Sequence, residues 1–174
     1  MISEEYKAEQ QRMHQEIPEY GVASVNFAPV VSKIVNELEI KDILDFGAGK
    51  GRLADALDIN HPATMTLYDP GIPGIDEPPT KQHEMVCCID VLEHIEPQHL
   101  EAVLDKLAEV TGRVGFFTVH TGPAKKVLSD GRNAHLIQEG SHWWLPKILE
   151  RFDLHSFNAV PNGFMVIVWR LQRT

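Results

Sequence analysis

The sequence predicts an α/β fold with a mostly parallel sheet and one antiparallel strand, which a hairpin contributes near the end of the chain. Short apolar runs of the kind that form buried parallel strands alternate with segments of helical periodicity. A turn with three glycines, at residues 47–51, follows the first of these runs. Two β-prone segments flank Pro161-Asn162-Gly163, and Asn-Gly is a strong hairpin signal. An alternating βα chain that closes with a hairpin must carry an antiparallel strand.

The composition predicts a single globular domain over residues 1–174, in which residues 1–23 form an N-terminal helical lid or arm. Hydrophobic residues make up 43% of the chain and charged residues 24%, as in ordinary soluble proteins. No apolar run approaches the length of a membrane span, and the first residues are too polar for a secretory signal. Cys87 and Cys88 are adjacent within an apolar run, so we expect buried thiols and a reducing, cytoplasmic location.

The net charge is −9 at pH 7. Affinity for long nucleic acids comes mostly from Lys and Arg contacts with phosphates, so this charge argues against such a partner. It favours a small-molecule ligand and leaves the oligomeric state open.

The predicted site begins with the first strand, Asp42–Phe46, and the turn that follows it. Glycines at positions 47, 49 and 51 let the chain turn sharply and let a ligand touch bare backbone. The helix expected over 52–57 would present unpaired N–H groups at its start, which suits a nucleotide-type ligand. A dinucleotide fingerprint would have a third glycine where Arg52 stands, so the pattern disfavours an NAD(P)-dependent oxidoreductase.

Two helices are expected before this strand. Residues 3–17 are polar with sparse apolar positions, which indicates a loosely attached surface helix that ends at Pro18 and Gly21. Residues 27–38 place apolar side chains at helical spacing, with Pro29 in the first turn, and predict a firmly packed amphipathic helix.

The second strand is expected over Ala63–Asp69. A carboxylate at the end of a second strand can accept both hydroxyls of a ribose, which makes Asp69 the second anchor of the site. Four prolines lie between Asp69 and Glu84, and a crossover helix alone needs about a dozen residues. We therefore expect irregular chain here, without helix or strand, and the second strand at an edge of the sheet.

The rest of the chain predicts four more strands and two helices. Apolar strands are expected over Met85–Ile89 and Arg113–Val119, and Pro97 opens an amphipathic helix between them. A last helix is indicated by the spacing of Leu145, Ile148, Leu149 and Phe152, with Pro146 tolerable only in its first turn. The hairpin strands are expected over 157–160 and 164–171, which makes six strands in all.

Four features in this order resemble the class I S-adenosylmethionine (SAM) methyltransferases. They are the loop Asp45-Phe46-Gly47-Ala48-Gly49-Lys50-Gly51, Asp69, the run Asp90-Val91-Leu92-Glu93-His94, and the final hairpin. The resemblance covers residues 24–171 and implies a minimal, Rossmann-like three-layer sandwich whose third strand is missing. It also implies cofactor-binding positions at Asp45, Phe46, Gly47, Ala48, Gly49, Gly51, Asp69, Pro70, Ile89 and Asp90.

The activity that this resemblance implies is methyl transfer from SAM to a small-molecule acceptor, with O-methylation favoured. An oxygen nucleophile must lose its proton, which suits a histidine, and His94, His120 and His135 are the candidate bases. Three alternatives stay open: a SAM-binding module without catalysis, an RNA 2′-O-methyltransferase and an NAD(P)-dependent oxidoreductase.

A metal site is a further hypothesis. Asp90, Glu93 and His94 are spaced to share one face of a helical turn, and two oxygen donors with an imidazole can hold a divalent cation. A similar pattern, completed by a later histidine, occurs in ubiquinone-pathway O-methyltransferases and small-RNA 2′-O-methyltransferases. The resemblance thus implies Asp90, Glu93, His94 and His135 as ligands of Mg²⁺ or Mn²⁺. In the metal-free alternative, His94 faces the substrate or caps the next helix.

Overall fold

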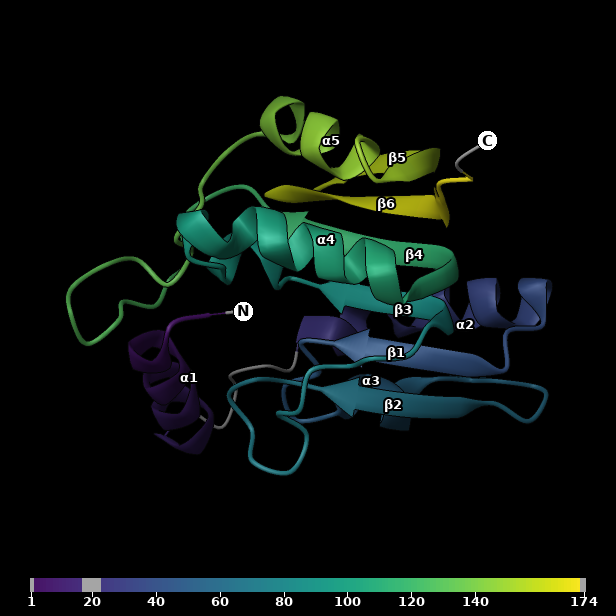
Figure 1. Ribbon diagram of the computed structural model, residues 1–174, viewed down its shortest axis with the longest axis horizontal. Coiled ribbons are helices and arrows are strands. Elements are labelled where there is room, and N and C mark those ends of the chain that lie inside the picture. The colour runs from purple at the N-terminus through teal and green to yellow at the C-terminus, as the bar shows by residue number, and fades with distance from the viewer. Residues whose placement is uncertain (1, 17–22, 173–174) are drawn as a thin grey trace.

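The chain folds around a six-stranded mixed sheet. A computed structural model describes residues 2–16 and 23–172. The described strands lie in the order β2-β1-β3-β4-β6-β5, which confirms the predicted number and places β2 at one edge (Figure 1). Strands β1 to β4 are parallel, and β6 is antiparallel to both of its neighbours. The strands are β1 (Asp42–Phe46), β2 (Thr64–Tyr68), β3 (His83–Ile89), β4 (Thr111–His120), β5 (Phe152–Val160) and β6 (Gly163–Arg170).

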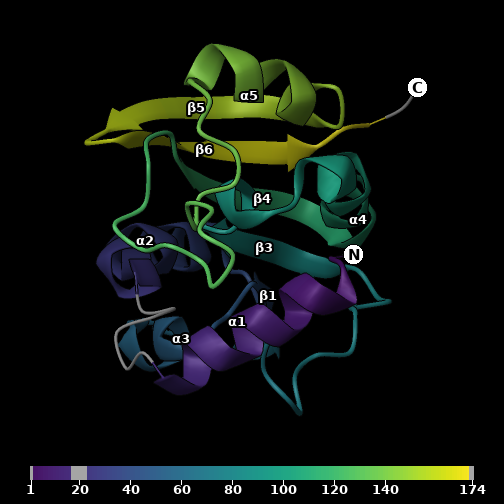
Figure 2. The same ribbon diagram turned by 90° about the vertical axis from the view of Figure 1, so that its left-hand side faces the viewer.

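Helices cover both faces of this sheet and complete three layers, as Figures 1 and 2 show. The face that carries α2 and α3 has its own apolar core, and so has the face that carries α4 and α5. These elements are α2 (Ala28–Leu38), α3 (Arg52–Ala56), α4 (Leu100–Val110) and α5 (Ser141–Leu149), with short 3₁₀ helices η1 (Ala23–Phe27), η2 (Leu92–His94) and η3 (Pro97–His99).

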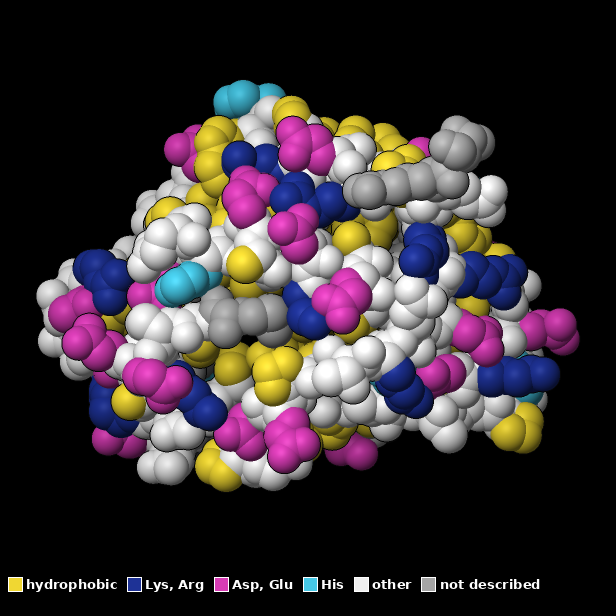
Figure 3. Space-filling view, viewed as in Figure 1, with side chains coloured by type: hydrophobic (Ala, Val, Ile, Leu, Met, Phe, Trp, Pro, Cys, Tyr) yellow, Lys and Arg dark blue, Asp and Glu magenta, His cyan; other side chains and the backbone are white. Residues whose placement is uncertain are grey.

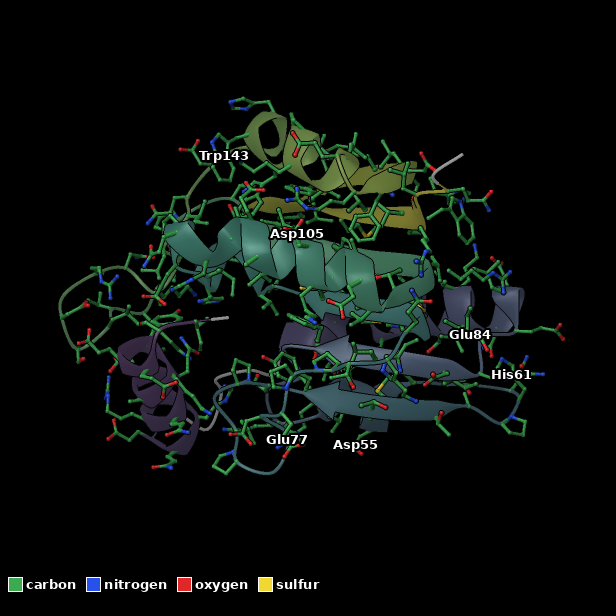
Figure 4. The ribbon with its side chains drawn as sticks, viewed as in Figure 1. Asp55, His61, Glu77, Glu84, Asp105 and Trp143 are labelled. Carbon is green, nitrogen blue, oxygen red and sulfur yellow. The ribbon has the colours of Figure 1, made fainter. Side chains whose placement is uncertain are left out.

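Packing on both faces fixes the strands firmly. On the α2 side, Val31 and Val35 are fully buried against Phe116 of β4. On the other side, Trp144 of α5 is fully buried, whereas Trp143 lies half-exposed beside it with Lys147 Nζ 4.7 Å from its ring centroid (Figure 4). Because both cores hold the sheet, the carboxyl ends of its parallel strands form a rigid rim for the loops that follow them.

The N-terminal helix α1 (Glu4–Glu16) is attached more firmly than we expected from its polar sequence. Tyr6 and Met13 are only 3% and 1% exposed, and they pack with Leu128 and Ala134 of the loop after β4. The prediction of a loosely attached helix is therefore wrong, because the few apolar side chains of α1 share one face at helical spacing. The end predicted at Pro18 and Gly21 lies outside the described residues.

The last helix and the first hairpin strand differ from the prediction. Helix α5 stops at Leu149, and Phe152 begins β5, where it pairs with Arg170. The spacing of Phe152 matched a helix only by coincidence, and β5 starts five residues before the expected position 157. Pro146 lies inside α5, beyond the first turn, at an exposed position where its ring stays out of the core.

Between β2 and β3 the chain from Asp69 to Gln82 contains neither helix nor strand, as its prolines predict. None of the described helices has the combination of length and apolar character that crossing a bilayer would require. Acidic and basic side chains are intermixed on the face drawn in Figure 3, without a continuous basic surface.

Candidate active site

The glycine turn after β1 is shaped by backbone conformations that favour glycine. Gly47, Gly49 and Gly51 have φ values of +82°, +53° and +69°, in the left-handed region. The N–H groups of Gly47 and Ala48 both donate to the carbonyl of Tyr68, at 2.7 and 2.9 Å. These bonds tie the turn to the end of β2, so the loop and the acid that follows β2 form one unit.

Asp69 is the acid at the end of β2, and its carboxylate is held by backbone donors. Gly49 N–H donates to Oδ2 at 2.9 Å, and Gly71 N–H donates to Oδ1 at 2.8 Å. A carboxylate has about four acceptor positions, so each oxygen can accept a further hydrogen bond. The side chain is therefore oriented in advance to bind a pair of hydroxyls.

A second carboxylate, Asp45, lies next to this unit in the buried part of β1. It is 1% exposed, and its Oδ2 has no hydrogen-bond partner among the described residues. Burial, assisted by the negative charge of Asp69, raises the pKa of Asp45 to about 7. A buried acceptor of this kind is suited to a ligand that brings its own donor or positive charge.

The turn after β3 carries the next group of predicted residues. Asp90 has a left-handed φ of +52°, and its N–H donates to the Thr118 hydroxyl at 2.9 Å. The same hydroxyl donates to Asp90 Oδ1 at 2.6 Å. This reciprocal pair locks the strained residue to β4 and orients the 3₁₀ turn that presents Glu93 and His94.

Three histidines meet beyond that turn. The rings of His94 and His135 lie 4.7 Å apart edge to face, and those of His120 and His135 also lie 4.7 Å apart. His94 Nδ1 is 2.8 Å from the carbonyl of Ala134, and His135 Nδ1 is 2.7 Å from the carbonyl of Gly122. A carbonyl only accepts, so both Nδ1 atoms carry the proton and both Nε2 atoms carry the lone pair.

The charge states of His94 and His135 follow from their burial. Burial, reinforced by His135, lowers the pKa of His94 to about 4. Burial also lowers the pKa of His135, in spite of its bond to Gly122. Both imidazoles are thus neutral at pH 7, which is the state that can take up a proton or bind a metal ion.

Glu93 is fully buried beside the histidines. His120 N–H donates to its Oε1 at 3.0 Å, while Oε2 has no partner among the described residues. Burial, followed by the charge of Asp90, raises the pKa of Glu93 well above its ordinary value. One ligand atom from each of Glu93, His94 and His135 lies within 4.8 Å of the others, and Asp90 does not belong to this group.

A single cavity of about 610 Å³ connects these groups. Gly47, Gly49 and Asp69 line one part of it, and His94, His120 and His135 line another. Ile89, Asp90 and Pro70, which the resemblance implied as cofactor contacts, also line it. The structure thus places residues that are far apart in the sequence around one cavity, whereas Asp45, Phe46, Ala48 and Gly51 do not line it.

One wall of this cavity consists of residues that we did not single out from the sequence. Tyr6, Gln10 and His14 of α1 line it, and His14 Nε2 lies 3.8 Å from Asp69 Oδ2. Lys125 and Lys126 line it as well. No periodicity marks these polar positions; the buried partners of Tyr6 and Met13, more than 100 residues away, decide where α1 lies.

The fold and the cavity together indicate the class of protein to which the chain belongs. A parallel sheet with a glycine turn after β1, an acid after β2 and a cavity across the strand ends is an α/β domain that binds a nucleoside-containing ligand. Residues 17–160 match the family described as the methyltransferase domain, and the chain belongs to that family. The resemblance to the class I SAM methyltransferases is thereby confirmed. No curated protein shows significant sequence similarity to the chain.

Solved structures share the fold at low sequence identity. A 1,6-didemethyltoxoflavin-N1-methyltransferase from Burkholderia thailandensis, with its substrate and S-adenosylhomocysteine (SAH) bound, has a TM-score of 0.68 at 16% identity, over 97% of this chain and 90% of its own. The N-methyltransferase NodS from Bradyrhizobium japonicum, with SAH, has 0.66 at 10%, over 96% and 99%. The magnesium protoporphyrin IX methyltransferase ChlM from Synechocystis, also with SAH, has 0.58 at 14%, over 93% and 86%.

Proposed function

We propose that this protein is a SAM-dependent methyltransferase that methylates a small molecule, with an oxygen atom as the favoured acceptor. The observation that carries the proposal is the shared cavity, in which the glycine turn and Asp69 adjoin a cluster of three histidines. We call Asp45, the turn at residues 47–51 and Asp69 the cofactor half. Glu93, His94, His120 and His135 are the acceptor half.

The residues of the cofactor half fit SAM group by group. Asp69 has acceptor positions for both ribose hydroxyls, and the unpartnered Oδ2 of Asp45 suits the amino group of the methionine part. Pro70, Ile89 and Asp90 line the same part of the cavity, and Phe46, Ala48 and Gly51 shape the turn. When bound, SAM supplies a methyl group activated by its sulfonium charge.

In the acceptor half the chain has two tasks: to align the nucleophile and to receive its proton. His135 is the first candidate base, because it lines the cavity and Gly122 fixes its Nε2 as the lone-pair nitrogen. His120 is the second. His94, half-buried and bonded to the carbonyl of Ala134, holds His135 in orientation through edge-to-face contact.

A divalent cation is a second candidate feature of the acceptor half. Glu93, His94 and His135 converge, and each imidazole is oriented by a main-chain carbonyl, as is usual for metal ligands. One carboxylate and two imidazoles suit Mn²⁺ better than Mg²⁺, which prefers oxygen. Asp90 is occupied with Thr118, so the proposed set narrows to the other three residues. A cation there would lower the pKa of an acceptor hydroxyl.

Two features of the architecture belong to the same proposal. The irregular chain at 70–82 stands where the family has its third strand and the helix before it. Within the arm predicted over residues 1–23, the part described as α1 acts as a lid, because it and the residue before it are held to three separate segments across the cavity. Ser3 bonds to Glu96, Lys7 to Asp76 and Glu9 to Ser129.

The proposal is tested first by calorimetry with SAH. Gly47→Ala should abolish measurable binding, because Gly47 has a left-handed φ and its new Cβ would collide with the side chain of Val91. Gly74→Ala is the matched control, since Gly74 has a φ of +95° with nothing within 4 Å. Equal SAH binding by Gly47→Ala and the parent would contradict the assigned cofactor half.

Catalysis is tested next, with SAM labelled on its methyl group. Incubation with separate metabolite, RNA and protein fractions should label the metabolite fraction, and EDTA followed by Mn²⁺ tests the cation. SAH binding without label in any fraction would favour the non-catalytic SAM-binding module. Label in the RNA fraction would favour the RNA methyltransferase, and full activity in EDTA would leave a metal-free site.

A further inference from the structure

The structure raises the question of what holds the base of the nucleoside. With the ribose on Asp69, the base must extend toward Pro70 and the turn after β3, which line the same cavity. Between Asp69 and Gln82 no strand is present to carry side chains toward it. A wall for the base must therefore come from another part of the chain.

Helix α1 lies where that wall is needed. Figure 2 shows α1 crossing in front of β1, on the side of the molecule where the parallel strands end. Gln10 is 9% exposed and lines the cavity, and it packs against Gly71, directly after Pro70. A Cβ added to Gly71 would lie 2.9 Å from Gln10 Cβ, so the two backbones approach as closely as glycine allows.

Two polar contacts and one buried side chain fix the part of α1 that precedes Gln10. Lys7 Nζ lies 2.9 Å from Asp76 Oδ2, which ties α1 to the irregular segment after β2. Ser3 N–H and its hydroxyl donate to the buried carboxylate of Glu96, at 2.7 and 2.8 Å. Tyr6, one turn before Gln10, is buried and lines the same cavity. The position of Gln10 is thus set by the fold.

The chemistry of these side chains fits adenine. A carboxamide offers one acceptor and two donors in a plane, which matches the 6-amino group of adenine and an adjacent ring nitrogen. An aromatic ring and a proline are suitable flat walls for a purine. We infer that Gln10 recognises the adenine of the cofactor, with Tyr6 and Pro70 as the walls of its pocket, so that α1 replaces the missing third strand. This inference rests on the proposed function, because it assumes that SAM is the cofactor.

The inference is tested by calorimetry on the full chain with two ligands. One is SAH, and the other is the SAH analogue in which hydrogen replaces the 6-amino group of the base. The parent should bind SAH about fivefold more tightly than the analogue, as one hydrogen bond predicts. Gln10→Met, of similar volume, should bind SAH about tenfold more weakly than the parent and lose the preference between the two ligands. Gln15→Met, at an exposed position on the same helix, should behave like the parent.

A measurement without mutation guards against a folding defect in the variant. In the parent, SAH should slow hydrogen exchange of the α1 amides, and the analogue should slow it less. Two results would overturn this inference but leave the proposed function standing. In the first, Gln10→Met still prefers SAH to the analogue. In the second, SAH protects the amides of the glycine turn from exchange but not those of α1. Failure of the parent to bind either ligand would instead overturn the proposed function.

Discussion

The two halves of the cavity are built from different parts of the polypeptide. The cofactor half consists mainly of backbone: three glycines with left-handed φ, N–H groups that hold Asp69, and strands packed on both faces. The acceptor half consists of side chains from three separate segments, which meet only after the chain has folded. The comparison teaches that local sequence can encode a backbone-built site, whereas a side-chain cluster depends on long-range packing.

The substitution His135→Ala should affect the acceptor half and leave the cofactor half unchanged, and it has the largest expected effect. Loss of a general base should lower methyl transfer by about 10²- to 10⁴-fold, with the affinity for SAH unchanged. The measurement is transfer of labelled methyl to the active metabolite fraction, alongside calorimetry with SAH. His155→Ala, on β5 against Trp169, is the histidine control. A parallel loss of SAH affinity would show that the two halves are not independent.

The halves should also respond to pH with opposite signs. Asp45 has a folded pKa of about 7, above its ordinary value of 3.8, so the unfolded state loses its proton first as pH rises. The stability that this group contributes is present below pH 4 and is lost as pH rises to 7. Relative to the parent, Asp45→Asn should gain on the order of 4 kcal/mol between these limits. Urea denaturation at several pH values measures this, with exposed Asp55→Asn as control.

His94, in the acceptor half, should show the reverse dependence. Its folded pKa of about 4 lies below the ordinary 6.5, so the unfolded state takes up a proton first as pH falls. The stability linked to neutral His94 is complete above pH 6.5 and is lost toward pH 4. Relative to the parent, His94→Asn should recover on the order of 3 kcal/mol across that window. A pH-independent difference in urea denaturation would mean that His94 is already solvated.

The same contrast explains what could be predicted from the sequence. The glycine turn, Asp69 and the edge position of β2 depend on residues close in sequence, and the prolines after Asp69 exclude a strand there. His94 and His135 were expected to lie together because both residue types are candidate metal ligands. Asp90 does not join them because its carboxylate is bonded to Thr118, and the spacing of residues along the sequence cannot reveal that bond. The firm attachment of α1 could not be predicted, because it depends on packing of Tyr6 and Met13 with residues of the loop after β4, more than 100 positions away.

A smaller effect, on the affinity for SAH, is expected when the negative charge of Asp69 is removed by a side chain of the same shape. Asp69→Asn keeps one acceptor oxygen but turns an NH₂ group toward a backbone N–H, so SAH affinity should fall about 100-fold. Asp153→Asn, at an exposed position of β5, removes a similar charge away from the cavity and should leave the affinity nearly unchanged. Calorimetry with SAH compares the two, and equal affinities would remove Asp69 from the proposed ribose site.

The smallest expected effect comes from a substitution in α1 that loosens its contact with the loop after β4. Glu9 accepts hydrogen bonds from the N–H and hydroxyl of Ser129, both at 2.9 Å, and so fastens α1 to the loop that carries His135. Glu9→Ala should cost about 1 kcal/mol of stability, because these bonds are partly exposed to water. The loss should appear as a KM for the acceptor raised about threefold, with kcat and SAH affinity unchanged, since only the loop position is loosened. Glu5→Ala, at an exposed position of the same helix, controls for the lost charge. A fall in kcat with KM unchanged would contradict this account and would indicate that Ser129 affects the methyl-transfer step itself.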